Sequence, residues 1–211
     1  MKKESQVIFD KNVIEFVTVA AEFCAFLERA ESMKRSTFVD TTLKILPLLY
    51  LKASMLPKCE MIGDESPETY VTEEIYEVLR INLASILAEK DDYLEVFLPD
   101  MAYSDEPIKK NISEDLADIY QDIKDFIFVF QLGLNETMND SLAICQENFG
   151  LLWGQKLVNT MRALHDVKYS PQARGEDEEE EEYEPQNNED CHCEDDDCHC
   201  HDHGCHCHDD E

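Results

Sequence analysis

The sequence predicts an all-α protein, a single bundle of about six helices followed by an acidic linker and a tail rich in cysteine and histidine. In the first 170 residues, apolar side chains recur at intervals of three and four, as in helices with one buried face. Gly-bounded runs of alternating apolar and polar residues, which would indicate strands, are absent. We therefore expect a helical domain over residues 1–170, a disordered linker over 171–190 and a Cys/His tail over 191–211.

Two helices are expected before residue 58. Asp10 is a favourable N-cap for the first, which runs to Ser32 with apolar side chains along one side. The second begins near Ser36. Pro47 lies inside it and, because proline lacks an N–H, should kink or divide this helix.

A loop, a third helix and a short fourth helix come next. Residues 58–68 contain glycine, proline and several acids, which is typical of a loop. Thr72 is expected to cap the third helix, because two acids follow it where they suit the positive end of the helix dipole. The fourth segment, DDYLEVFLPDM from residue 91, is stopped around Pro99, and a loop over residues 102–112 follows.

The last two helices carry the clearest periodicity. Ser113 is the expected N-cap of the fifth, whose apolar residues repeat in steps of three and four. The sixth spans roughly residues 136–167, with Trp153 expected in the core. Gly150 and Gly154 lie four apart on it, and such a pair in a bundle more often lets another helix approach than binds a ligand.

Negative charge is concentrated at the C-terminal end. The formal net charge is -30, and residues 175–211 hold 18 of the 48 acidic residues and no lysine or arginine. Phosphates of nucleic acids and anionic membranes would be repelled, so we expect neither as a partner. The N-terminus lacks the apolar segment of a signal peptide and no apolar run approaches 18 residues, so we expect a cytoplasmic protein.

The residues after 174 predict a disordered linker and a repeat. The stretch GEDEEEEEYEP has no apolar periodicity and cannot offset its ordering entropy by burial. A seven-residue unit then occurs three times, as CHCEDDD from 191, CHCHDHG from 198 and CHCHDDE from 205. The unit has no apolar a and d positions, which excludes a coiled coil.

The repeats concentrate metal ligands. Thiolate and neutral imidazole are preferred by Zn(II), Ni(II), Co(II) and Cu(I), and a flexible chain can bring four of them to one ion. We therefore expect the tail to bind Zn(II), Ni(II) or another soft or borderline transition metal, about three ions if the metal is zinc. The expected ligands are Cys191, His192, Cys193, Cys198, His199, Cys200, His201, His203, Cys205, His206, Cys207 and His208.

The ligand spacing favours a flexible metal buffer or delivery arm. A zinc finger usually has Cys-x2-Cys and a packed fold, whereas this tail has Cys-x-Cys and no hydrophobic residue to pack. It is similar to the tails of nickel chaperones and to metallothionein-like segments. The other interpretation is a solvated extension incidental to function. Redox catalysis is disfavoured, because no basic residue or helix N-terminus lowers a thiol pKa there.

Two groups of polar residues in the body are candidate sites. Asp115, Asp118, Asp122 and Asp125 fall on one stripe of the fifth helix, which would suit a divalent cation or a basic partner but is more often a solvated face. His165 is the only histidine before the tail, and such a residue usually caps carbonyls or is satisfied in the core.

No catalytic residue is predicted. The chain has no nucleophile elbow, P-loop, dinucleotide fingerprint or His-Glu-x-x-His motif, so we expect no enzyme. One enzyme hypothesis remains, a catalytic site near Asp118, Asp122, Arg162 and His165. It would require the fold to bring these residues together in a geometry that the sequence does not show. An aspartate paired with Arg162 in the core would instead be structural.

Four motifs in order resemble a known family. They are DDYLEVF (91–97), ISEDLADI from 112, the spacing of Phe149 to Trp153-Gly154, and MRALH (161–165). Together they resemble the bacterial domain of unknown function 5063 family over roughly residues 8–168. The resemblance implies an all-helical cytoplasmic domain and no particular activity, and the linker and tail lie outside the family pattern.

Two functions therefore stay open. In the first, the helical body docks on a partner or dimerises while the tail captures, buffers or delivers a transition metal. In the second, the body is a protein–protein interaction module of unknown partner and the tail is incidental.

Overall fold

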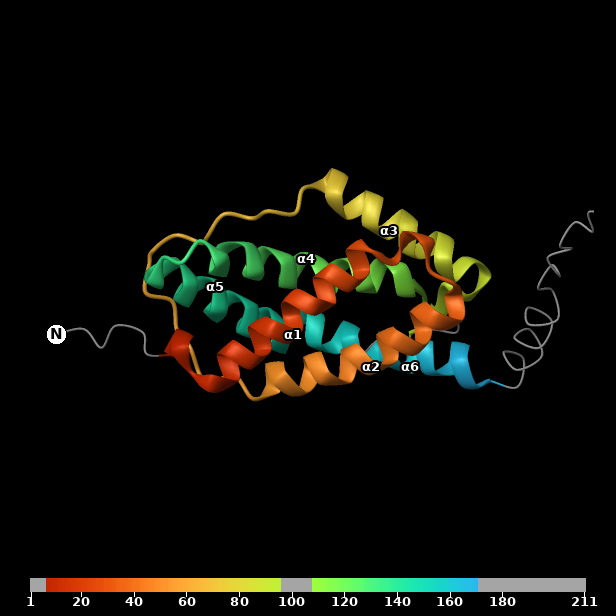
Figure 1. Cartoon of the computed structure of the whole chain (residues 1–211), viewed down its shortest axis with the longest axis horizontal. Coiled ribbons are helices and arrows are strands. Elements are labelled where there is room, and N and C mark those ends of the chain that lie inside the picture. Colours follow the sequence, from red (N-terminus) through yellow and green to blue (C-terminus); the bar gives the residue numbers. More distant parts are fainter. Residues whose placement is uncertain (1–6, 96–107, 171–211) are drawn as a thin grey trace, which may run out of the picture.

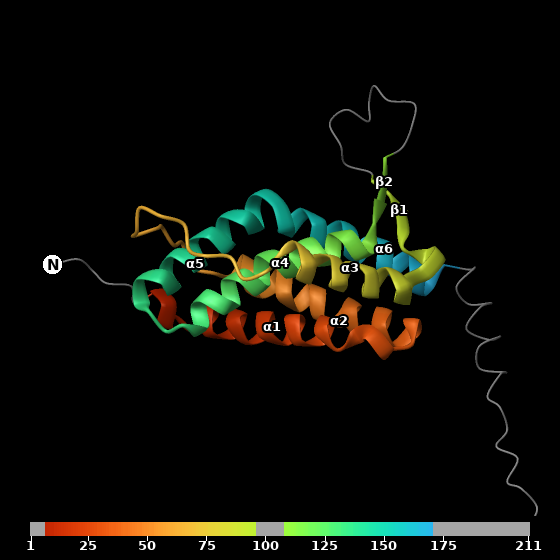
Figure 2. The same ribbon diagram turned by 90° about the horizontal axis from the view of Figure 1, so that it is seen from above.

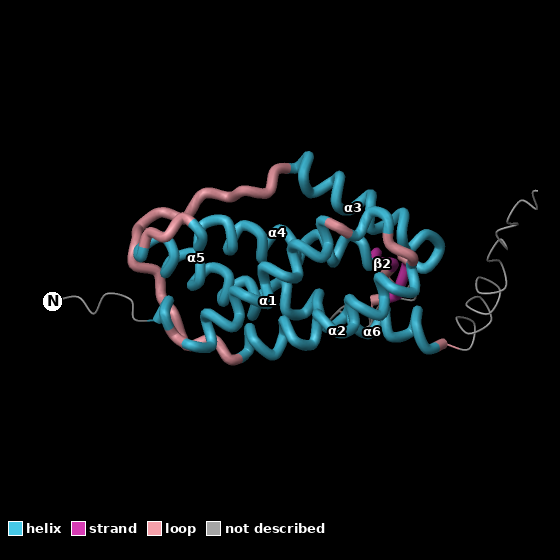
Figure 3. Tube along the Cα trace, viewed as in Figure 1, coloured by secondary structure: helices cyan, strands magenta, loops and turns pink. Residues whose placement is uncertain are grey.

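Helices dominate the part of the chain that the structure, a computed structural model, describes, namely residues 7–95 and 108–170 (Figures 1 and 3). The all-α prediction is therefore confirmed, with one small antiparallel hairpin added. The helices are α1 (Lys11–Glu28), α2 (Arg35–Ser54), α3 (Glu73–Leu87), α4 (Ile112–Gln131), α5 (Asn135–Asn148) and α6 (Gly154–Tyr169), and the strands are β1 (Asp92–Leu94) and β2 (Lys109–Asn111).

The central helix of the bundle is α4, which contacts α1, α3, α5 and α6 (Figure 2). Leu116, Ile119 and Ile123 repeat at steps of three and four on α4, and all three are fully buried. The ring of Phe16 on α1 lies 5.5 Å from that of Phe126 on α4 and 6.5 Å from that of Trp153. These rings lie where α1, α4 and the residue before α6 meet, and the core continues from there into α2, α3 and α5.

Two helix starts follow the local sequence. The Asp10 side chain accepts a hydrogen bond from the Asn12 N–H at 2.8 Å, and Thr72 Oγ1 accepts one from the Ile75 N–H at 3.3 Å. Both side chains satisfy an N–H that the first helical turn leaves without a partner. The predicted caps at Asp10 and Thr72 are confirmed.

The start of α4 differs from the prediction, because Ser113 is not its cap. The helix begins at Ile112, and Asp91 accepts hydrogen bonds from both the N–H and the hydroxyl of Ser113 at 2.7 Å. The Ile112 N–H also donates to the Asp91 carbonyl at 2.8 Å. A residue outside the helix and distant in sequence thus supplies the cap, which no local pattern indicates.

The short helix predicted from residue 91 is wrong where the structure describes it. Asp92–Leu94 instead pairs with Lys109–Asn111 in the antiparallel hairpin, which projects from the bundle beside α6 in Figure 2. Ala88, whose φ is 48°, ends α3 just before it. Tyr93 and Glu95 face inward and alternate with exposed neighbours, a period of two that is too short to identify from the sequence.

Pro47 does not divide α2, which continues from Arg35 to Ser54. Leu46 and Leu49 on either side of the proline are fully buried, so core packing holds both halves in one helix. Tertiary contacts here outweigh the cost of the missing backbone hydrogen bond.

The predicted sixth helix is divided by a π turn, Phe149–Trp153, between α5 and α6. A Cβ at Gly154 would lie 2.3 Å from the Phe149 carbonyl oxygen and 2.9 Å from the Phe149 ring, whereas at Gly150 it would meet nothing within 4 Å. The expectation that both glycines admit another helix is wrong, because the close neighbour of Gly154 belongs to the π turn. Trp153 is fully buried, as predicted, and its Nε1–H donates to the Cys145 carbonyl at 3.1 Å.

We expect Gly154→Ala to lower the free energy of unfolding by about 2 kcal/mol or more, because the new methyl group overlaps the backbone of the π turn. The matched control Gly150→Ala should change it little, or raise it by up to about 1 kcal/mol through helix propensity. Urea denaturation followed by circular dichroism measures both. Equal effects from the two substitutions would contradict this account of the turn.

Candidate functional site

The twelve cysteine and histidine residues predicted to bind metal, between Cys191 and His208, lie outside the described residues. Within residues 7–95 and 108–170, the structure has no group of three or more His, Cys, Asp or Glu side chains arranged to hold a metal ion. In the described residues, the polar side chains that could form a site lie on α4 and on the elements packed against it.

The three cysteines of the body are held as thiols. Burial raises the pKa of Cys24 to about 12 and that of Cys145 well above its usual value. The pKa of Cys59, which is half-buried, is raised first by burial and then by the nearby Asp140 carboxylate. Since the thiolate is the form that binds metals, these side chains are poor ligands near neutral pH.

The aspartate row on α4 is not a solvated face, which corrects the prediction. Asp115 accepts a hydrogen bond from the hydroxyl of Tyr93 in β1, and Asp118 accepts one from Tyr76 of α3 at 2.8 Å. Asp118 also forms an ion pair with Lys156 of α6.

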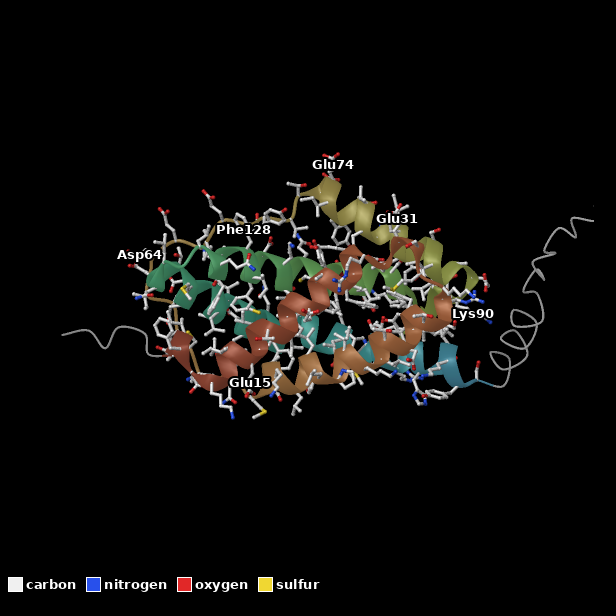
Figure 4. All side chains as sticks on the ribbon, viewed as in Figure 1. Glu15, Glu31, Asp64, Glu74, Lys90 and Phe128 are labelled. Carbon is white, nitrogen blue, oxygen red and sulfur yellow. The ribbon has the colours of Figure 1, made fainter. Side chains whose placement is uncertain are left out.

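The other two aspartates reach further segments. Asp122 Oδ1 accepts a hydrogen bond from Asn148 of α5 at 2.6 Å. Asp125 Oδ1 accepts two, from the backbone N–H groups of Tyr70 and Val71, at 2.7 and 2.8 Å. The row therefore joins α4 to the hairpin, α3, α6, α5 and the connection that precedes α3. By contrast, Glu31, Asp64 and Glu74 lie on the outside of the bundle (Figure 4).

A pocket of about 370 Å³ lies where this row meets α5 and the start of α6. The long connection between α2 and α3 closes the remaining side of the pocket, and it runs past the α4–α5 end of the bundle in Figure 1. The ring of Tyr70, within this connection, stacks on that of Phe128, with 4.7 Å between the ring centroids. The acidic side chains that line the pocket are Glu68, Asp118, Asp122 and Asp125, and Lys156 is the one basic side chain among its described lining residues.

The pocket walls combine charge with apolar surface. Burial raises the pKa of Asp122, partly opposed by the hydrogen bond from Asn148, and the neighbouring Asp125 and Asp118 raise it further. Burial also raises the pKa of Asp125, against the two backbone N–H donors. Phe126, Ile144 and Leu152 form the apolar part of the lining. Burial and mutual repulsion both destabilise the ionised form of these carboxylates. A cation bound beside them would stabilise that form.

Comparisons with known proteins place the whole helical body in one family. A family model described as "Domain of unknown function (DUF5063)" matches residues 7–170. The chain belongs to the DUF5063 family. The crystal structure of protein BF1032 from Bacteroides fragilis is 92% identical in sequence, with a TM-score of 0.73, and the match covers 80% of this chain and 99% of that one. No curated protein matches the chain.

The hypothetical catalytic set of the DUF5063 domain is not assembled. Asp118 and Asp122 line the 370 Å³ pocket, whereas Arg162 and His165 line a separate hollow of about 770 Å³ beside the hairpin. Arg162 and His165 are both exposed, so neither the expected buried pairing nor a core histidine is found. The His165 ring instead contacts that of Tyr169 at 4.6 Å.

Three polar residues of the pocket were not among the sequence predictions. Ser141, Asn148 and Lys156 line the pocket together with Cys145 and Leu152. With Cys145 and Leu152 they recur at intervals of three and four, the spacing of one helical stripe, which is the signal that could have identified them. None of the helices in the described part of the DUF5063 domain has the length and apolar character needed to cross a membrane.

Stability of the DUF5063 domain should depend on Asp115, which is 5% exposed and whose pKa burial raises to about 6, despite the hydrogen bond from Tyr93. Because the folded state then holds a proton that the unfolded state releases, this group should lower the free energy of unfolding as pH rises from about 4 to 6, by roughly 2 kcal/mol. Denaturant titrations of wild type and Asp115→Asn across this range measure the difference, and a difference independent of pH would contradict the assignment.

Asp140→Asn is the matched control with the opposite sign. Burial raises the pKa of Asp140, but hydrogen bonds from the Ile62 N–H, Asn139 and the Gly63 N–H outweigh it, so the pKa is lowered overall. The stabilisation from Asp140 should therefore be present above its unfolded pKa and be lost as pH falls below about 4.

Proposed function

We propose that this DUF5063 protein binds transition-metal ions through residues 191–208 and that its helical body carries this segment. The supporting observation is the density of ligands, with six cysteines and six histidines in 18 consecutive positions. Such a set suits Zn(II), Ni(II) or another soft or borderline ion. The function is metal buffering or delivery, and the chain is a binding protein rather than an enzyme.

The thiol chemistry of the body supports the assignment to this segment. Raised pKa values keep Cys24, Cys59 and Cys145 protonated, so they compete weakly for soft ions. The acids among the repeats add a negative field that attracts cations, and the thiols must lose protons on binding. Affinity should therefore fall as pH drops. A reducing compartment such as the cytoplasm keeps these thiols available.

Metal uptake by the full-length chain tests the proposal. With a chromophoric chelator as competitor, wild type should take up about three Zn(II) ions per chain. Replacing the six cysteines between Cys191 and Cys207 by serine should weaken uptake at least tenfold, because histidines and acids alone remain.

Cys59→Ser is the matched control, since it removes the least buried thiol of the body and should leave uptake unchanged. Equal uptake by wild type and the six-serine variant would show that the six cysteines are not the ligands and would refute the proposal. Circular dichroism verifies that all three proteins share one helix content.

The second candidate function is the interaction module, favoured by apolar residues on the outer side of α2. Leu48, Leu51 and Met55 are each at least 44% exposed, and Leu151 of the π turn is 70% exposed. Under this reading, Leu51→Glu should remove the proteins captured by full-length bait, while the six-serine variant should retain them. Capture by the Leu51→Glu variant but not by the six-serine variant would instead assign partner binding to the metal-binding segment.

A further inference from the structure

The 370 Å³ pocket is lined by residues of the body and has its own hydrogen-bonding character. Asp122 uses Oδ1 for Asn148, and Asp125 uses Oδ1 for both backbone donors. The Oδ2 atoms of Asp122 and Asp125 accept no hydrogen bond from any residue in the described ranges. Ser141 donates its hydroxyl hydrogen to the Met138 carbonyl at 3.0 Å, which leaves only its oxygen lone pairs for a ligand. The pocket therefore offers mainly acceptors.

The charges of the pocket are not balanced from within. Lys156 is paired with Asp118 and also lowers the pKa of Asp122 through its charge, but it forms no ion pair with Asp122 or Asp125, and neither does any other basic side chain of the described residues. These two carboxylates lie one helical turn apart on α4, so a single cationic group can reach both. A ligand with positive charge and several N–H donors would satisfy the oxygen atoms that the protein leaves free.

The floor and the rim of the pocket define the rest of the ligand. Cys145 is 2% exposed, lines the floor, and its thiol forms no hydrogen bond within the described residues. Phe126, Ile144 and Leu152 supply apolar surface beside the carboxylates, and Leu152 is 52% exposed at the rim. The volume lies at the lower end of small-molecule sites, which suits a short hydrocarbon chain with a charged end.

We propose that this pocket binds an organic cation, an alkylammonium or alkylguanidinium group, through Asp122 and Asp125, with its hydrocarbon part on Phe126, Ile144 and Leu152. Two sources supply this chemistry: a free small amine or guanidine, and a lysine or arginine side chain of a peptide. The site does not depend on the metal-binding segment, so the six-serine variant should retain it.

Trp153 provides a fluorescent reporter next to the pocket lining. It is the single tryptophan of the chain and directly follows Leu152, and its indole N–H is bonded to the backbone of Cys145. Full-length protein in 150 mM salt, which screens nonspecific attraction by the acidic residues, is titrated with n-butylguanidinium and n-butylammonium while its fluorescence is recorded. The uncharged probe n-butanol has the same hydrocarbon stem.

A saturable fluorescence change is expected with at least one of the two cations and none with n-butanol. Asp122→Asn keeps an acceptor for Asn148 but removes the charge, so the Kd should rise at least tenfold. The matched control Glu147→Gln makes the same change of charge at an exposed α5 position outside the pocket lining, and should alter the Kd less than twofold.

A second variant keeps the test decisive if Asp122→Asn fails to fold. Leu152→Lys places an ammonium group at the exposed rim and should weaken cation binding equally, because the new charge competes for the carboxylates. No saturable change with either cation, or an unchanged Kd in the folded variants, overturns the proposal.

The same titration with a capped Gly-Arg-Gly peptide and a capped Gly-Lys-Gly peptide distinguishes the sources. Tighter binding of a peptide than of its matching butyl probe assigns the site to a basic side chain of a partner protein. Tighter binding of the butyl probe assigns it to a free small molecule, because the peptide backbone is then excluded at the rim.

Discussion

The arrangement of the bundle depends on carboxylates placed on the central helix. Four aspartates of α4 bond to five other parts of the body: Asp115 to β1, Asp118 to α3 and α6, Asp122 to α5, and Asp125 to the backbone before α3. Each lies beside the apolar stripe of α4, where an unsatisfied carboxylate or donor costs about 1–3 kcal/mol. These directional bonds add to the packing of the apolar stripe in fixing the positions of the neighbouring elements along and around α4.

The sequence predicts correctly those features of the fold that depend on residues close together in the chain. The helical class, the caps at Asp10 and Thr72 and the burial of Trp153 were all predicted, because each depends on residues within a turn or two. The cap of α4 by Asp91, the hairpin and the partners of the aspartates were not, since every one joins residues far apart in the sequence. A row of aspartates at helical spacing reads as a solvated face until the donors on other elements are located.

The π turn, Phe149–Trp153, affects which side chains line the candidate pocket. An extra residue in one turn changes which side chains of α6 face α4, and Gly154 is required because the turn leaves no room for a Cβ. The turn is followed directly by the helix that brings Lys156 to Asp118, while Leu152 within it lies at the pocket rim. Under the two proposals, the body and the appended ligand array would hold two kinds of cation through different residues.

The contact between Asp91 and Ser113 has a dynamic consequence. Because the amides of Ile112 and Ser113 donate to Asp91, which lies just before β1, we expect local opening of the hairpin and of the start of α4 to be coupled. Solvent exchange of the Ser113 amide hydrogen requires its bond to Asp91 to break, so its rate would report the opening of this joint segment.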